Sequence, residues 1–351
     1  MKNILFILHL PPPIHGAAQV GKYIKESKLI NNDFQSDYIN LTTAYQLNEI
    51  GKNSKNKYLR TLNILISVFH LTSKKKYDLC YLTLTAKGAG FLKDLFVVLL
   101  LKITRQNIIY HFHNKGVADN KASNIKKILY RFVFKDTKII LLSPKLYFDI
   151  ADFVKPKDVF YCANGIPEIK LIIKEKRITT CNLLFLSNMI EQKGIFILLE
   201  ACKFLKKKNL LFNCHFVGAW SDVTEEGFNN TVYEYNLQDH VFVHGPKYGK
   251  EKQRFFQLAD VFVLPTFYDN ECFPLVLLEA LQFNLPIVST PEGGIPDIVI
   301  EGETGFLIPK KNSTALAKTL ELLINDPHLG FKMGKKGREL YEKEFTLEQF
   351  E

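Results

Sequence analysis

The 351-residue sequence has few cysteines, and their spacing matches no common metal-binding or redox motif. There are six, scattered along the chain, with no C-x-x-C pair among them. We therefore expect reduced thiols, most of them in the core, in a cytoplasmic protein rather than a disulfide framework or a zinc site. The six cysteines are at positions 80, 162, 181, 202, 214 and 272.

Long apolar runs are also lacking. The longest uninterrupted one covers residues 95–101, whereas a helix needs about 20 apolar residues to span a bilayer. The first segment, residues 1–8, is too short for the apolar part of a signal peptide with its cleavage site. We expect it to form a buried strand, and we expect no membrane-spanning segment.

Two ligand-binding motifs are absent as well. The chain contains no G-x-G-x-x-G, so it lacks the dinucleotide fingerprint. It contains no Asp-x-Asp, which argues against a diphosphate held through a divalent cation. We therefore expect no metal and no cofactor.

Charge is distributed unevenly between the two halves of the chain. Residues 1–165 contain 25 basic and 11 acidic residues, and residues 166–351 contain 21 and 25. A basic half predicts a polyanionic partner, either an anionic membrane surface or nucleic acid. We favour the membrane because no nucleic-acid motif occurs. Within this half, residues 124–135 could lie on a bilayer, although a helix with a core-facing stripe (residues 125, 128, 129, 132 and 133) is the favoured interpretation.

Strand-like apolar runs alternate with helical patterns along the whole chain, which predicts parallel sheets covered by helices. We expect an α/β protein with two Rossmann-like domains, at residues 1–168 and 169–330, followed by a helical segment at 331–351. The predicted strands are 3–9, 78–84, 107–112, 138–142 and 158–162 in the first domain, and 182–187, 211–217, 240–243, 260–264 and 286–289 in the second. Predicted helices include 58–73, 91–103, 124–135, 195–206 and 314–324.

The most informative segment is residues 269–280, between two strand-like runs. Pro274 is expected at the first position of a helix, where its missing N–H costs nothing. Glu271 would then lie in the preceding loop, and Glu279 about 7 Å along the helix axis. Two carboxylates would bracket a helix N-terminus that favours phosphate, which suggests a ligand with a sugar, a diphosphate and a ribose.

Three further segments lie where strands give way to loops, the ligand-binding edge of such sheets. Gly16 allows close backbone approach at the start of a helix. His111 and His113 share one face of a strand, with Phe112 opposite, and suit proton transfer near neutral pH. Lys193 lies beside a helix start and suits a diphosphate. The alternative interpretations are an ordinary loop at Gly16, core imidazoles or a metal pair at the two histidines, and a solvated side chain at Lys193.

Taken together, these motifs resemble the retaining nucleotide-sugar glycosyltransferases of glycosyltransferase family 4, which have the GT-B fold. The resemblance covers nearly the whole chain and is strongest over residues 182–309. Its carriers are the ECFPLVLLE motif at 271–279, Lys193-Gly194, NGI at 164–166, EGGIPD at 292–297 and GETGFLIP at 302–309.

The resemblance implies a cleft between two facing sheets and a role for each matched residue. Glu271 would contact the donor sugar and Glu279 the ribose. The backbone of Phe273, Pro274 and Leu275 would meet the phosphates, with Lys193. His113 would face the reaction centre, and Gly16 matches the glycine loop of the first domain. The family's usual arginine is replaced by Asn188, its usual glycine by Cys272, and residues 331–351 would form a short crossover to the first domain.

The implied reaction is metal-independent transfer of a hexose-type sugar, with retained configuration, from a UDP- or GDP-sugar. The acceptor would be a saccharide, lipid-linked at the inner face of the membrane, in bacterial-type surface polysaccharide synthesis. Catalysis would rest on His113, Glu271 and Lys193, and no protein nucleophile is assigned. The alternatives are a GT-B epimerase or phosphorylase and a non-catalytic nucleotide-sugar-binding scaffold.

Overall fold

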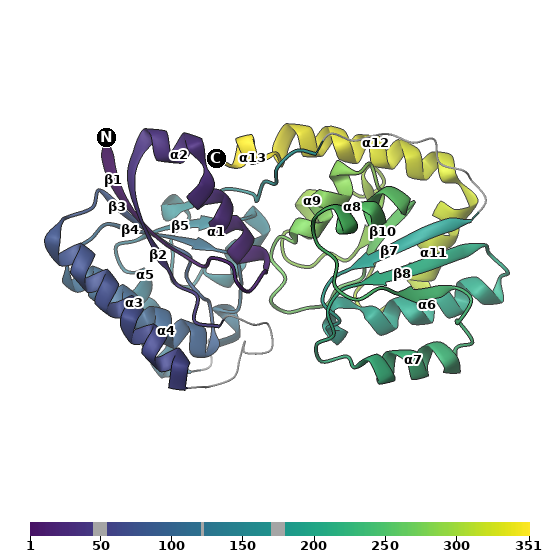
Figure 1. The fold of residues 1–351 in the computed structure, drawn as a ribbon, viewed down its shortest axis with the longest axis horizontal. Coiled ribbons are helices and arrows are strands. Elements are labelled where there is room, and N and C mark those ends of the chain that lie inside the picture. Colours follow the sequence, from purple (N-terminus) through teal and green to yellow (C-terminus); the bar gives the residue numbers. More distant parts are fainter. Residues whose placement is uncertain (45–54, 121–122, 170–179) are drawn as a thin grey trace. The chain divides into compact units, whose positions relative to one another are not determined.

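A computed structural model describes residues 1–44, 55–120, 123–169 and 180–351. The chain divides into two compact units, an N-terminal unit (Met1–Asn164) and a C-terminal unit (Gly165–Phe350). Each is built on its own sheet of parallel strands (Figure 1). The predicted α/β class with two Rossmann-like sheets is therefore confirmed. Most of the stretch in which we expected the domain boundary, residues 170–179, lies outside the described residues.

The sheet of the N-terminal unit has the strand order β2-β1-β3-β4-β5-β6. Parallel crossovers are right-handed, so the reversal after β2 places α1 on one face and α3, α4 and α5 on the other. The elements are β1 (Lys2–Leu8), α1 (Gly16–Glu26), α2 (Lys28–Asp33), β2 (Phe34–Asn40), α3 (Lys55–Lys74), β3 (Leu79–Leu82), α4 (Gly88–Ile103), β4 (Ile108–Phe112), α5 (Asn124–Phe134), β5 (Lys138–Leu141) and β6 (Val159–Tyr161), with short 3-10 turns at Ala118–Asn120, Pro144–Asp149 and Pro156–Asp158.

The sheet of the C-terminal unit has the order β12-β11-β10-β7-β8-β9. All four residues of its central strand β10 are buried, as expected for a parallel strand covered on both faces. The elements are β7 (Cys181–Leu186), a 3-10 turn (Glu191–Lys193), α6 (Ile195–Lys207), β8 (Phe212–Val217), α7 (Glu225–Glu234), β9 (Val241–Val243), α8 (Gly249–Leu258), β10 (Val261–Leu264), α9 (Leu275–Gln282), β11 (Ile287–Ser289), α10 (Ile295–Ile298), β12 (Gly305–Leu307), α11 (Ser313–Asn325), α12 (Pro327–Glu344) and α13 (Leu347–Phe350).

All ten predicted strands are present, but the described residues form two more. The strand β2 was missed because it is an edge strand whose burial is confined to Ile39. The strand β12 was missed because it has only three residues, Gly305–Leu307. Each of these two strands completes one end of a six-stranded sheet.

Two local predictions were wrong. Pro274 is the N-cap of α9 rather than its first residue, with ψ at 118°, outside the helical range. In α5 the favoured core-facing stripe fails, because Ile125 and Ile128 are 72% and 63% exposed. The helix instead turns Tyr130, Val133 and Phe134 toward the core, so part of its apolar pattern faces solvent.

Candidate active site

The loop between β10 and α9 in the C-terminal unit holds Glu271 against Lys193. Glu271 is only 6% exposed, and Lys193 Nζ lies 2.5 Å from its carboxylate. The same ammonium group lies 4.8 Å from the ring centroid of Tyr268, within range of a cation–π contact. Lys193 and Glu271 are far apart in sequence, yet the fold brings them together as one polar pair.

Two glycines make this approach possible. Gly194 has a φ of +89°, and a Cβ there would lie 2.2 Å from the Pro265 carbonyl oxygen. Gly293 has a φ of +55°, and its Cβ would lie 2.4 Å from the Glu271 carbonyl oxygen. Because other residues are strained at these angles and no space remains for a side chain, both positions require glycine. The loops that carry Lys193 and Glu271 are thereby packed directly on neighbouring backbone.

Glu279 lies on α9, just over one turn past its start, and forms an ion pair with Lys252 of α8. A third lysine–glutamate pair joins Lys310 to the buried Glu292, which lies in the loop that packs on Glu271. The predicted sugar and ribose carboxylates are thus both held by cations of the same unit. A ligand with a diphosphate could take over these cations, and its hydroxyls could then bind the carboxylates.

Apart from Gly16, which begins α1 of the N-terminal unit, the other predicted donor contacts belong to the same unit. Cys272 and Phe273 are each 4% exposed, and the Phe273 ring packs on Phe345 with 5.7 Å between centroids. Leu275 is the first residue of α9. Asn188 is half-buried in the loop after β7, where its carbonyl accepts the Ile190 N–H at 2.8 Å.

In the N-terminal unit, His111 and His113 lie side by side at the carboxyl end of β4. Their ring centroids are 4.2 Å apart, as two residues on one face of a strand require. His111 Nδ1 forms a hydrogen bond with the Tyr81 hydroxyl, and the buried Nε2 of His113 has no hydrogen-bond partner among the residues that the structure describes. Phe112, on the opposite face, packs on Phe134 with 6.0 Å between centroids.

His9 and His15 extend this histidine cluster. His15 caps α1, which starts at Gly16, by accepting the Ala18 N–H on Nδ1 at 3.3 Å, so its neutral ring carries the proton on Nε2. Burial lowers the pKa of His113 to about 3, with the charge of nearby His15 as the second cause. Burial and then Lys93 lower the pKa of His9 well below its usual value. The lowered pKa values favour neutral imidazoles throughout the cluster at neutral pH.

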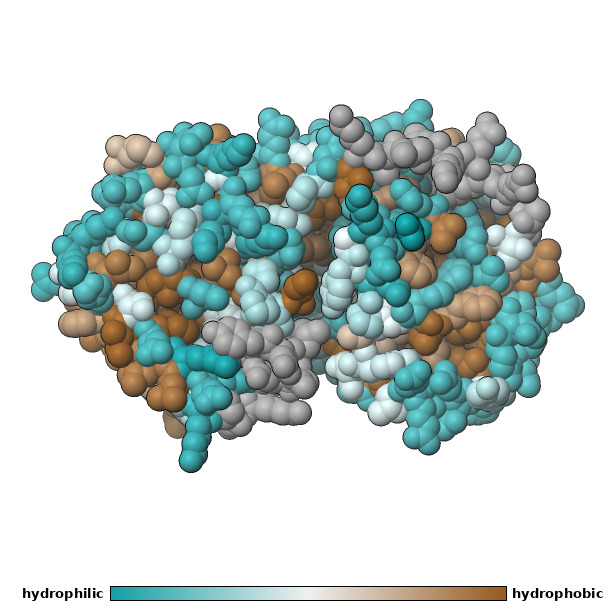
Figure 2. All heavy atoms as spheres, in the orientation of Figure 1, coloured by the Kyte–Doolittle hydropathy of each residue, from teal (hydrophilic) through white to brown (hydrophobic). Residues whose placement is uncertain are grey.

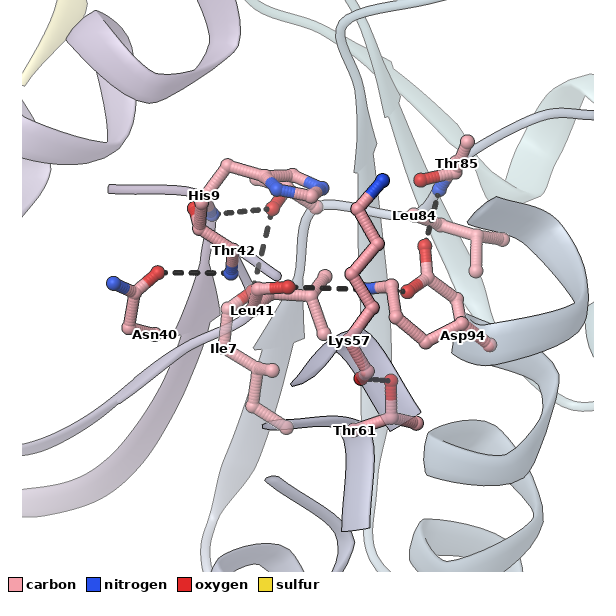
Figure 3. Close-up of polar contacts among 12 residues, drawn as sticks. Ile7, His9, Asn40, Leu41, Thr42, Lys57, Thr61, Leu84, Thr85 and Asp94 are labelled. Carbon is pink, nitrogen blue, oxygen red and sulfur yellow. Dashed lines mark hydrogen bonds and ion pairs between the residues drawn. The ribbon is translucent and has the colours of Figure 1, made fainter. Parts of the chain in front are cut away.

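Hydrogen bonds fix the loops that carry this cluster (Figure 3). The His9 N–H donates to the Thr83 hydroxyl at 3.2 Å. Lys93 donates to the Leu41 carbonyl at 3.0 Å and pairs with Asp94 at 2.7 Å. The fully buried Asp94 also accepts the N–H of Thr85 at 2.9 Å. The ends of β1, β2 and β3 are thus tied together.

The loop after His113 is held by Asp149. This buried carboxylate accepts the N–H groups of Gly116, Val117 and Ala118 at 2.9, 3.2 and 2.9 Å. A carboxylate with three backbone donors is well satisfied in a buried position. The strand end that presents His113 is therefore rigid.

Acidification should destabilise the protein between about pH 6.5 and pH 3. The unfolded His113 binds a proton near pH 6.5 and the folded one near pH 3, so in that window the unfolded state holds more protons and stability falls as pH falls. We expect His113→Asn to remove up to about 1.4 kcal/mol per pH unit of this slope. Urea melts from pH 7 to pH 5 would measure it.

The matched control is His328→Asn, at an exposed position on α12. This variant should leave the slope of stability against pH unchanged. A His113→Asn slope equal to that of the wild type would contradict the neutral, buried state of His113.

Several residues of these clusters were not expected from the sequence. Lys252 pairs with Glu279, Tyr268 lies against Lys193, and Lys310 pairs with Glu292 in the adjoining loop. His9 and His15 join the histidine pair. The presence of two histidines near the end of the first predicted strand could have pointed to His9 and His15. Nothing in the sequence pattern distinguishes the three others from solvated side chains.

The described residues contain no group of three or more His, Cys, Asp or Glu side chains that could hold a metal ion. No helix in the described ranges combines the length and apolar content that a bilayer span requires.

Comparison with known families identifies the part of the chain that carries Lys193, Glu271 and Glu279. Residues 170–340 match the model of the family described as glycosyl transferases group 1. These residues belong to the group 1 glycosyl transferases.

Two curated relatives agree with this group 1 assignment. The putative colanic acid biosynthesis glycosyltransferase WcaL of Salmonella typhimurium is 33% identical over 140 residues, which cover 38% of this chain and 34% of WcaL. The amylovoran biosynthesis glycosyltransferase AmsK of Erwinia amylovora is 27% identical over 228 residues, which cover 63% of this chain and 56% of AmsK. The matched stretches thus span about a third to just over half of these relatives.

Solved structures extend the likeness over both units of the chain. Anabaena HepE, in complex with UDP, is similar with a TM-score of 0.76 at 15% identity, covering 100% of this chain and 97% of HepE. A likeness at this identity shows the fold alone. It confirms the two-domain glycosyltransferase fold, GT-B, that was expected from the sequence.

Proposed function

We propose that this protein is a retaining, metal-independent glycosyltransferase of the family 4 type, which moves a hexose from a UDP- or GDP-sugar to a saccharide acceptor. The observation that carries the proposal is the Lys193–Glu271 pair, 2.5 Å apart at the start of α9, with Glu279 further along the same helix. A cation, a helix N-terminus and two carboxylates together match the chemistry of a diphosphate between two polyhydroxyl groups.

Each residue has a role in this reaction. Lys193 and the first N–H groups of α9, after Pro274, stabilise the negative charge that grows on the diphosphate as the bond to the anomeric carbon breaks. Glu271 accepts hydrogen bonds from sugar hydroxyls, and Glu279 from the ribose. In the N-terminal unit, His113 stays neutral and offers its unpartnered Nε2 to a sugar hydroxyl. As the new glycosidic bond forms, the acceptor hydroxyl passes its proton to the departing diphosphate.

The acceptor we infer is a lipid-linked saccharide at the cytoplasmic face of a membrane, in surface polysaccharide synthesis. WcaL and AmsK are named as glycosyltransferases of colanic acid and amylovoran biosynthesis, the former as a putative one. The basic first half of the chain supports contact with anionic lipid headgroups. Peripheral attachment would bring the enzyme to an acceptor that cannot leave the bilayer.

Donor binding can be tested by thermal melting with nucleoside diphosphates and their sugars, in the presence of EDTA. A ligand at about 100 times its dissociation constant stabilises the folded state by about 2.7 kcal/mol, which should raise the Tm by about 5–10 °C for a unit of this size. We expect UDP or GDP to give this shift with and without EDTA. The absence of a shift with any nucleotide would overturn the proposal.

A turnover assay with the stabilising nucleotide sugar and a lipid-linked saccharide extract separates the proposal from its alternatives. Transfer with retained anomeric configuration supports it. Conversion of the nucleotide sugar without an acceptor would indicate an epimerase, and release that requires inorganic phosphate would indicate a phosphorylase. Binding without any turnover would leave a non-catalytic scaffold.

A further inference from the structure

Three consecutive helices of the N-terminal unit expose apolar side chains along their outer faces. In α3 and α4 the spacings of three and four residues place these side chains in one stripe on each helix. A shorter stripe runs along α5. The exposed residues are Leu59, Leu62, Ile66 and Phe69 on α3, Leu92, Phe96, Leu99 and Ile103 on α4, and Ile125, Ile128 and Phe132 on α5. We call this set the outer apolar face.

The outer apolar face is not the core side of these helices. Each helix buries a second stripe against the sheet, for example Val68 on α3, Val97 on α4 and Val133 on α5, all fully buried. The helices are therefore apolar on two opposite sides. An amphipathic helix in a protein surrounded only by water needs just one such side.

The stripes of α3 and α4 form one continuous surface. A groove between the two helices is lined by six apolar side chains, Leu65, Ile66, Phe69, Phe96, Leu99 and Leu100. Figure 2 shows hydrophobic atoms gathered over α3 and α4, with hydrophilic atoms around them. On the side of α5, Lys102 of α4 lies 5.4 Å from the ring centroid of Phe132. Exposed apolar surfaces of this extent usually mark an interaction site.

The charges on these helices are almost all positive. The single acidic residue in α3, α4 and α5 is Asp94, which is fully buried beside Lys93. The same three helices contain nine basic residues: Lys55, Lys57, Arg60, Lys74, Lys93, Lys102, Lys126, Lys127 and Arg131. No exposed carboxylate on these three helices can therefore repel an anionic partner.

We propose that the outer apolar face docks on an anionic lipid bilayer, with its aliphatic and phenylalanine side chains among the acyl chains and its lysines and arginines at the headgroups. Basic residues beside large apolar ones are the composition of helices that lie in a membrane interface. The proposal deepens the membrane contact of the proposed function and rests on it for the position of the acceptor. It assigns that contact to α3 and α4, with α5 at the edge.

A second copy of the chain is a poorer occupant of this face. In a two-fold dimer the same surface patch meets itself, so cations of one copy would face the same cations of the other. Like charges placed opposite one another at an interface oppose association. A bilayer that contains acidic lipids offers the opposite charge and an apolar phase together.

The first test is flotation of the full chain with vesicles, measured without donor or acceptor. We expect binding to vesicles rich in phosphatidylglycerol, and at least tenfold weaker binding to pure phosphatidylcholine. The double variant Ile66→Asn, Phe96→Asn should bind the phosphatidylglycerol vesicles at least tenfold more weakly. In the variant Lys127→Gln, Arg131→Gln, the affinity for these vesicles should fall about fivefold for each charge that contacts the bilayer surface in the wild type.

The matched control is Leu258→Asn, Phe331→Asn in the C-terminal unit. These residues are 63% and 67% exposed, similar to Ile66 and Phe96 at 57% and 54%. This variant should bind vesicles like the wild type. The Ile66 and Phe96 variant and this control should both melt like the wild type, since they replace solvent-exposed side chains. Equal loss in the control, or unchanged binding in the Ile66 and Phe96 variant, would overturn the assignment.

A second measurement reports insertion directly. The chain has one tryptophan, Trp220, which lies in the C-terminal unit after β8. In Phe69→Trp, brominated lipids should quench the added emission, while the emission of Trp220 in the wild type stays unquenched. If the emission of the tryptophan at position 69 stayed unquenched on vesicle-bound protein, the proposal would be overturned. It would also be overturned if the Ile66 and Phe96 variant changed its oligomeric state but still bound vesicles.

Failure here and failure of the proposed function remain distinguishable. Vesicle binding needs no nucleotide, and the thermal shift with UDP or GDP needs no vesicle. If only vesicle binding fails, the docking proposal is overturned and the proposed sugar transfer stands. If only the thermal shift fails, the proposed sugar transfer is overturned and the docking proposal stands.

Discussion

Replacing Lys193 by alanine should reduce sugar transfer by about 10²–10³-fold in kcat, the usual effect of removing one group that stabilises charge in a transition state. Glu271→Ala should cause a comparable loss, because the sugar would lose its hydroxyl acceptor. The two effects should not add, since the two side chains form one pair 2.5 Å apart. Initial rates of the two single variants and the double variant would measure this coupling.

The fold must survive for these rates to be informative. Lys193→Ala leaves the buried Glu271 carboxylate without its cation, which lowers stability. Lys193→Gln removes the charge but keeps a hydrogen-bond donor for Glu271, so it should melt closer to the wild type than Lys193→Ala does and still lose transfer. Full activity in Lys193→Gln or in Glu271→Ala would contradict the assigned roles.

A matched control for the pair exists in the same unit. Lys208 and Glu321 form another lysine–glutamate pair at 2.5 Å, but the Lys208 side chain is 55% exposed. Exposed pairs contribute little, about 0–1 kcal/mol. Lys208→Ala should therefore leave both transfer and melting close to the wild type.

Gly194→Ala should be among the most destabilising single substitutions in the C-terminal unit. The residue has a φ of +89°, and the new Cβ would lie 2.2 Å from the backbone oxygen of Pro265. Backbone strain and steric overlap together should cost about 3–5 kcal/mol. For a unit of this size that lowers the Tm by roughly 10 °C, and the displaced turn should also move Lys193 and abolish transfer.

Gly330→Ala is the opposite case and serves as its control. Gly330 lies within helix α12, and a Cβ there would make an ordinary contact, 3.6 Å from Cγ of Pro286. Alanine loses less entropy than glycine on folding, so we expect about 0.4–1 kcal/mol of stabilisation. Differential scanning calorimetry of both variants should show shifts of opposite sign. A Gly194→Ala protein as stable as the wild type would mean that the turn at Lys193 is not tightly packed.

The sequence predicted elements well where burial is continuous. Strands such as β10, whose four residues are all buried, appear as short apolar runs between turn residues. The edge strand β2 has Gln35, Ser36 and Asp37 in succession, so its pairing with β1 depends on neighbours that no local pattern reveals.

The linear part of the site was predictable because one strand–loop–helix unit contains it. Glu271 and Glu279 lie within nine residues, and the proline between them marks the start of α9. The role of Lys252 was not predictable from the sequence, because its pairing with Glu279 depends on how α8 packs. The outer apolar face was missed for another reason, since apolar periodicity shows that a helix has a stripe but not which side faces the core.

The three lysine–glutamate pairs of the candidate site have a consequence for ligand selection. Lys193, Lys252 and Lys310 are each neutralised by a glutamate of the protein. A bare anion that captured Lys193 would leave the buried carboxylate of Glu271 without its cation, at a cost that offsets the anion's own attraction. A ligand that brings hydroxyl groups together with its phosphates satisfies both halves of the separated pair. The pairing therefore disfavours inorganic phosphate and sulfate before any contact with the sugar or base is considered.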